Sequence, residues 1–159
     1  MILPFKSLPH LKDLTVVPFE VPATLREIQS YADWWVCEGQ LRRKRFVFRV
    51  IGNREVGMGH IYRALTLAHA IVDHELIFVC HPDDETAVNK IAGLDYPVYV
   101  IEDGKVTQQL LELQPQLVIN DCLDTEEPEI RRLRAAGVRV INFEDLGTGA
   151  KAADRVVNE

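Results

Sequence analysis

No apolar run in this sequence reaches the roughly 18 residues that a helix needs to cross a bilayer. The first residues, MILPFKSLPHLKDL, also lack the basic start and the continuous apolar stretch of a secretory signal. These two absences exclude an integral membrane protein and argue against export. We therefore expect a cytoplasmic protein without a membrane span.

Lysine and arginine are in short supply, with 18 such residues against 24 aspartates and glutamates, for a net charge of -6. Binding to a phosphate backbone needs clustered basic residues, so nucleic acid is not expected as the principal partner. The one basic cluster, RRKR at 42–45, fits a nucleic-acid or membrane contact less well than the solvated end of a linker. The acidic excess lies after residue 50, which indicates a boundary near residue 45.

Cysteine is also sparse, and Cys37, Cys80 and Cys122 show no C-x-x-C spacing. They are expected to be reduced thiols, with neither a metal nor a disulfide role. The sequence has no Walker loop, no G-x-S-x-G elbow and no Cys/His nucleophile pair. No cofactor is therefore expected.

What the sequence does contain, from residue 46 onward, is an alternation of short β-branched runs with helical ones. This pattern is typical of β-α-β units, and it predicts a Rossmann-like, doubly wound α/β domain with a mainly parallel sheet. Strands are expected at 46–52, 75–80, 98–102, 116–121, 138–143 and 155–158. Helices are expected near 59–72, 83–92, 105–113 and 126–136. A chain of 159 residues, 47% hydrophobic, suffices for one such core.

Residues 1–44 do not follow this alternation. Prolines break the first 22 residues into extended pieces, and residues 24–44 then have a helical pattern that includes Trp34 and Trp35. We expect an irregular arm or linker with a helix at 1–44, followed by the α/β domain at 45–159.

The strongest functional signal is a Gly-x-Gly-His turn between the first strand and the first helix of the domain. Gly57 and Gly59 allow a sharp turn and a close approach of helix N–H groups to an anion or a sugar, and with Met58 they are candidate substrate-binding residues. His60 is the candidate general base, or else a histidine that only caps the helix. Arg63 could hold a phosphate or a carboxylate, or be an exposed helix arginine.

Ligands of open α/β sheets bind beyond the carboxyl ends of the strands, so acidic residues there are further candidates. Asp121 could orient His60 or bind a sugar hydroxyl, or cap the turn that follows it. Asp145, next to Glu144, is a candidate for substrate binding, or else a residue that, like Asp121, only caps the turn after its strand. The acidic HPDDE segment at 81–85 could bind a metal, but capping of the next helix explains it better, and no metal site is expected.

The segments RVIGNREVGMGHIYRALTLAHAI, LVINDCLDT and VINFEDLGTGAKAADRVVN resemble the N-terminal half of the SpsG/PseG-like family. These GT-B-type nucleotide-sugar enzymes act in spore-coat polysaccharide and pseudaminic acid synthesis. By this resemblance His60 is the catalytic histidine, which activates a water that displaces UDP, and Gly57 and Gly59 surround the sugar and diphosphate. Residues 32–38 are similar to the terminal helix of an acylneuraminate cytidylyltransferase.

The resemblance implies half an enzyme. The expected function is that of a hydrolase or glycosyltransferase domain acting at the anomeric carbon of a UDP-amino-sugar, in surface-polysaccharide or nonulosonic acid synthesis. A C-terminal GT-B domain or a partner chain would complete the site, so the chain alone should be inactive or weak. The alternatives are a noncatalytic nucleotide-sugar-binding or assembly domain associated with a cytidylyltransferase, and a dinucleotide-binding domain. The last is weakened because Tyr62 and Arg63 stand where a third glycine would be.

Overall fold

The computed structural model describes residues 43–158. The predicted arm, its helix and the terminal-helix similarity at 32–38 lie outside the described residues, and the domain boundary near residue 45 stays a prediction. From Lys44 onward the chain forms one compact unit. Its elements, in chain order, are β1 (Arg45–Val50), α3 (Gly59–Ala70), β2 (Glu75–Cys80), α4 (Glu85–Ala92), β3 (Val98–Val100), α5 (Val106–Glu112), β4 (Leu117–Asp121), α6 (Glu127–Ala135), β5 (Arg139–Phe143), η2 (Thr148–Ala152) and β6 (Arg155–Val157).

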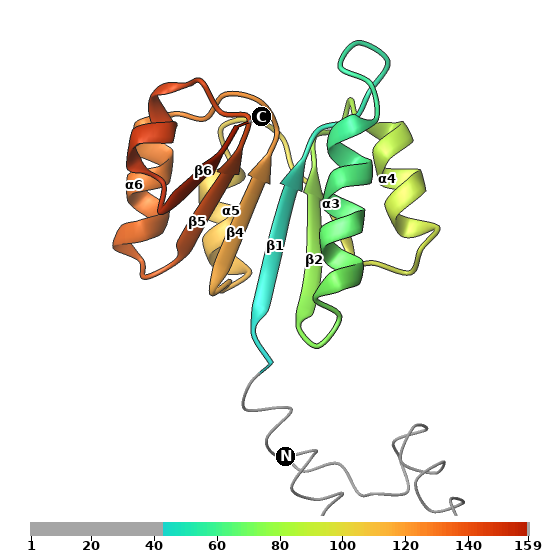
Figure 1. Cartoon of the computed structure of the whole chain (residues 1–159), viewed down its shortest axis with the longest axis horizontal. Coiled ribbons are helices and arrows are strands. Elements are labelled where there is room, and N and C mark those ends of the chain that lie inside the picture. Colours follow the sequence, from blue (N-terminus) through green and yellow to red (C-terminus); the bar gives the residue numbers. More distant parts are fainter. Residues whose placement is uncertain (1–42, 159) are drawn as a thin grey trace, which may run out of the picture. The chain divides into compact units, whose positions relative to one another are not determined.

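The strands form a six-stranded parallel sheet in the order β3-β2-β1-β4-β5-β6. The predicted doubly wound α/β fold is therefore confirmed (Figure 1). Every strand and helix predicted after residue 45 is present, and the ends differ from the prediction by at most two residues. Strands β2 and β3 lie on one side of β1, and β4, β5 and β6 lie on the other side. The strand order therefore reverses at the neighbouring strands β1 and β4.

Helices cover both faces of this sheet, as the continuous apolar runs of its central strands predicted. Val47 of β1 belongs to a hydrophobic cluster with Leu110 of α5 and with residues of α6. Its neighbour Phe48 points the other way, into a second cluster with Ile61 of α3 and with residues of α4. Successive side chains of a strand point to opposite faces, so two cores form, one on each face of the sheet. Figure 1 shows the helices that cover these faces.

Asp84 of the β2–α4 loop holds the loop between β1 and α3 by hydrogen bonds. The buried carboxylate of Asp84 accepts hydrogen bonds from the Gly52 N–H (3.2 Å), from Asn53 Nδ2 (3.0 Å) and from the His81 N–H (3.2 Å). Asp84 occupies the N-cap position of α4 but makes no capping hydrogen bond. The prediction that HPDDE caps this helix is therefore right in position but not in its hydrogen bond, because the Asp84 carboxylate ties two loops together instead.

Gly52 is the glycine on which packing at this edge depends. A Cβ atom at this position would collide with the side chain of Ile61 on α3 and lie 3.1 Å from that of Ala87 on α4. The strand end therefore passes directly under α3. Helix α3 is held close to the sheet in this way, and its first turn is placed beside the end of β4.

Candidate functional site

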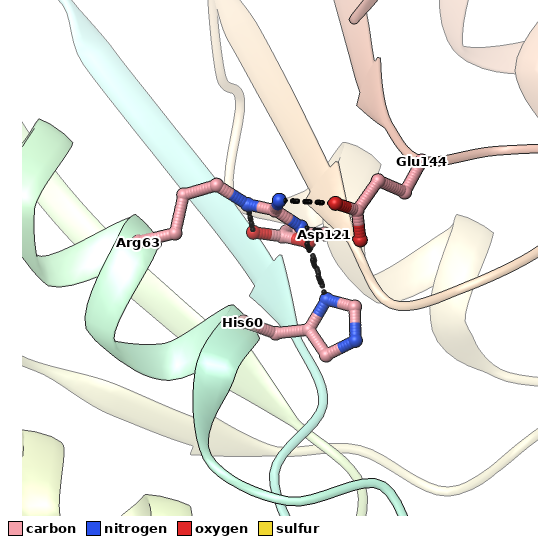
Figure 2. A network of polar contacts seen from close by, with 4 residues as sticks. All are labelled: His60, Arg63, Asp121 and Glu144. Atoms are coloured by element: carbon pink, nitrogen blue, oxygen red, sulfur yellow. Dashed lines mark hydrogen bonds and ion pairs between the residues drawn. The ribbon is translucent and has the colours of Figure 1, made fainter. Parts of the chain in front are cut away.

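Four polar side chains from three segments of the chain meet beside the ends of β1, β4 and β5 (Figure 2). His60 and Arg63 lie on the first turns of α3, Asp121 ends β4, and Glu144 directly follows β5. Because β1 and β4 are neighbours in the sheet, this position is the point where the strand order reverses, which is where open α/β sheets bind their ligands. Three of the residues predicted for the site, His60, Arg63 and Asp121, are thus brought into contact.

His60 is held by Asp121. Its Nδ1 lies 2.6 Å from Asp121 Oδ1, and the Asp121 side chain is 1% exposed while that of His60 is 11% exposed. A neutral imidazole that donates from Nδ1 to this carboxylate keeps Nε2 as an unprotonated acceptor. Asp121 therefore fixes both the orientation of the ring and the nitrogen that can take a proton. This is the contact that the predicted role of Asp121 in orienting His60 requires, and the role itself stays a prediction.

Arg63 is bound along two edges of its guanidinium by two different carboxylates (Figure 2). On one edge Nε and Nη2 donate to the buried Asp121, at 2.8 and 2.7 Å. On the other edge Nη1 and Nη2 donate to Glu144, at 2.7 and 3.0 Å. The guanidinium also lies over the ring of Phe143, with Cζ 5.3 Å from the centroid. Arg63 is therefore neither a simple exposed helix arginine nor, in this structure, unpaired.

The charges of the cluster are tightly coupled. Hydrogen bonds to Asp121 and then to Glu144 raise the pKa of Arg63 above its ordinary value. The hydrogen bond from Arg63 lowers the pKa of Glu144, whose side chain is 38% exposed. With a neutral imidazole, the cluster holds one positive and two negative charges. A bound anion would meet a net negative charge as long as Glu144 stays where it is.

The predicted glycines differ in what they do. Gly57 has a φ of 85°, which a glycine adopts without strain, so the turn does need it. Gly59 begins α3, and a Cβ atom there would meet nothing within 4 Å. Met58 stands at the N-cap position, makes no capping hydrogen bond and packs its partly buried side chain against the α3/α4 core. The start of α3 is thus open, while the side chain of Met58 turns toward the core. Substrate binding by these three residues stays a prediction.

Asp145 makes no hydrogen bond to the residues of this cluster. It is 2% exposed, and its carboxylate accepts hydrogen bonds from Thr125 (Oγ1 2.6 Å, N–H 3.1 Å), the Gly147 N–H (2.8 Å) and Asn142 Nδ2. Burial by itself raises the pKa of Asp145, but these hydrogen bonds together outweigh it and the net pKa is lowered. The structure gives Asp145 the role of bracing the loop after β4 against β5. Its contact with a substrate stays a prediction.

Glu144 is the member of the cluster that was not selected from the sequence, although it stands next to Asp145. The choice between these two acids depended on the backbone after β5. Glu144 has a φ of 51°, in the left-handed region, and this breaks the alternation of side chains along the strand. Two adjacent acidic residues after a strand indicate a candidate site in the sequence. The local sequence does not predict which of the two side chains faces α3.

A hollow with a volume of about 310 Å³ opens apart from this cluster, at the carboxyl ends of β1, β2 and β3. It is lined among others by Arg49, His81, Asp103 and Cys122, and Arg49 Nη1 donates to Glu129 on α6 at 2.7 Å. Burial raises the pKa of Cys122 to about 11, so this thiol is protonated at neutral pH. The predicted glycines, His60, Arg63 and the two predicted aspartates do not line this hollow.

Two structural findings bear on the predicted absences. Among residues 43–158, no three His, Cys, Asp or Glu side chains are grouped so that they could hold a metal ion. Within the same residues, no helix is both long and apolar enough to cross a membrane.

Comparison with known proteins identifies a fold rather than a family. No family model matches the chain. An uncharacterized protein of Methanocaldococcus jannaschii is 32% identical over 112 residues, which cover 67% of this chain but 23% of that protein. Among solved structures, MurG of Acinetobacter baumannii, a GT-B glycosyltransferase, is similar with a TM-score of 0.54 and 15% identity. That match covers 72% of this chain and 41% of MurG, so the chain has the fold of part of a GT-B protein.

Proposed function

We propose that this chain is the N-terminal domain of a nucleotide-sugar hydrolase or glycosyltransferase that acts at the anomeric carbon of a UDP-amino-sugar. The GT-B-like fold and the position of the polar cluster at the reversal of strand order support this proposal. The biosynthesis of surface polysaccharides or nonulosonic acids is its proposed setting, by the resemblance of GMGHIYR and its flanking segments to SpsG/PseG-like enzymes.

The observation that carries the proposal is the pairing of His60 Nδ1 with the buried Asp121 carboxylate. A general base needs a free acceptor nitrogen and a fixed ring, and this contact supplies both. In the proposed reaction, the oxygen of a water or of an acceptor hydroxyl attacks the anomeric carbon, and His60 Nε2 takes the proton from that oxygen. The bond from that carbon to the diphosphate oxygen breaks, and UDP leaves with the bonding electron pair. Asp121 stabilises the imidazolium that results.

A second half is needed to hold the nucleotide. The chain spans 41% of MurG and 23% of the curated relative, which supports the proposal that a C-terminal domain or a partner chain completes the cleft. Residues 45–159 are proposed as the catalytic-base half, and residues 1–44 as an arm that connects it to a cytidylyltransferase-like region.

The test is UDP release from a panel of UDP-amino-sugars by the chain together with the completing domain. His60→Ala should lower kcat at least about 100-fold, the usual effect of losing a general base. His69→Ala replaces an exposed histidine near the other end of the same helix. This variant is the matched control and should leave kcat unchanged. Equal UDP release by wild type and His60→Ala removes His60 from this role. Binding of UDP-sugars without any release favours the alternative, a noncatalytic binding or assembly domain.

A further inference from the structure

The contacts of Arg63 differ in kind at its two edges. The edge formed by Nε and Nη2 binds Asp121, a carboxylate that is 1% exposed and also bound to His60. The edge formed by Nη1 and Nη2 binds Glu144, whose side chain is 38% exposed and has no other side-chain partner among the described residues. One edge is therefore fixed in the protein interior, while the other faces solvent through a single replaceable carboxylate.

Arg63 does not need Glu144 to keep its position. The bidentate contact with Asp121 fixes the plane of the guanidinium, and the ring of Phe143 lies beneath it at 5.3 Å from Cζ. If the Glu144 side chain rotates away, the outer edge is left as two parallel N–H donors at an unchanged place. Such a fork matches the oxygens of a phosphate as well as those of a carboxylate.

We propose that the outer edge of Arg63 is a binding site for a phosphate-type anion, and that Glu144 is an internal occupant which the anion displaces. The inference rests on the proposed function for the nature of the anion, the diphosphate of a nucleotide sugar. It adds that the site is closed by its own glutamate until the ligand arrives. Displacement removes one negative charge from beside the ligand, so the anion then meets one positive and one negative charge instead of a net negative cluster.

The neighbouring backbone supports an exchange at this place. Helix α3 begins at Gly59, four residues before Arg63, without a side-chain cap and with no acidic residue in its first turn. Its N–H groups add to the attraction for an anion that has replaced Glu144. His60 Nδ1 lies 3.3 Å from Arg63 Nη2, so an anion on the outer edge would be bound beside the imidazole ring of His60.

Calorimetric titration of the full chain with inorganic pyrophosphate tests the site directly. Glu144→Gln keeps the shape of the side chain but removes its charge, and we expect it to bind pyrophosphate about fivefold more tightly than wild type, as for loss of an exposed competing ion pair. Glu75→Gln is the matched control, because Glu75 of β2 also forms a bidentate, partly exposed pair, with Arg45 of β1 (3.0 and 3.1 Å). It should leave the affinity unchanged.

Arg63→Lys provides a second, independent variant, because lysine keeps the charge but cannot bind Asp121 and an anion with two parallel donors. It should lose pyrophosphate binding, measured on samples whose circular dichroism matches that of wild type. The proposal is overturned if Glu144→Gln does not bind pyrophosphate more tightly than wild type, or if Glu75→Gln gains as much affinity as Glu144→Gln. It is also overturned if Arg63→Lys binds pyrophosphate as tightly as wild type.

A parallel titration with UDP distinguishes the source of the phosphate. The same gain for pyrophosphate and UDP means that the diphosphate alone is recognised, and a gain for UDP that is absent with pyrophosphate overturns the site as described. The two proposals fail separately. If no UDP is released but Glu144→Gln still binds pyrophosphate more tightly than wild type, only the proposed enzymatic function is refuted. If UDP release depends on His60 but Glu144→Gln binds pyrophosphate no more tightly, only the proposal of a displaceable glutamate is refuted.

Discussion

Asp121 is the residue whose replacement should reveal most about the site, because it is 1% exposed and binds both His60 and Arg63. Asp121→Asn keeps the size of the side chain and removes its charge. The new amide can accept at one oxygen, but its NH₂ group faces N–H donors of Arg63 or the ring of His60. The substitution therefore leaves Arg63 with an unsatisfied inner edge.

The magnitude follows from the burial of the pair. Removing one partner of a fully buried ion pair costs about 3–5 kcal/mol. The Arg63 side chain is 23% exposed and keeps its contacts with Glu144, so water and that carboxylate offset part of the loss. We expect the free energy of unfolding to fall by about 2–3 kcal/mol, in the range found for losing hydrogen bonds to a charged group.

Urea unfolding at pH 7, followed by circular dichroism, measures this loss. With an m-value of about 1.5 kcal/mol/M, the midpoint should fall by about 1.3–2 M. Glu144→Gln is the comparison, since it removes the exposed carboxylate on the other edge of the same Arg63 and should shift the midpoint far less. Equal midpoint shifts for the two variants would refute the reasoning that burial, and not the number of hydrogen bonds, sets the cost.

Two further predictions concern the loops around the site. Gly52→Ala should destabilise the domain by about 1–3 kcal/mol, as overpacking does, whereas Gly59→Ala, where a Cβ meets nothing within 4 Å, should not lower stability; thermal unfolding of the two variants compares them. Asp145 has a lowered pKa in the folded protein, so its contribution is present above the unfolded-state pKa of about 3.9 and is lost as the pH falls below it. Asp145→Asn should therefore be less stable than wild type at pH 7 and lose less stability on acidification, and parallel pH profiles of the urea midpoints would contradict this.

The sequence predicted the fold well because the signals involved are local. Alternating β-branched and helical runs placed each strand and helix after residue 45, and continuous apolar runs such as LIFVC predicted strands covered on both faces. Asp84 shows where local rules failed. Its position before α4 is that of an N-cap, but its carboxylate binds the Gly52 N–H 32 residues away, which no local pattern could indicate.

The candidate site was predicted in part for the same reason. His60, Arg63 and Asp121 follow from the rule that residues after the strands share one edge of the sheet, and the structure does bring them together. The sequence pattern favours Asp145 over Glu144, but in the structure it is Glu144 that contacts Arg63, because the left-handed backbone at Glu144 turns its side chain that way. A single residue's φ in a loop is set by the packing around it.

By itself, the sequence determined the order and type of the elements and the placement of His60 at the start of a helix, since hydrophobic periodicity and glycine turns act over a few residues. Only the tertiary structure decided what the charges do. The partners of Arg63 lie 58 and 81 residues away, and they reach it because β1 pairs with β4 and β4 with β5. Strand order and register determine which distant carboxylates meet, and the strength of those contacts depends on burial, which is a property of the assembled domain.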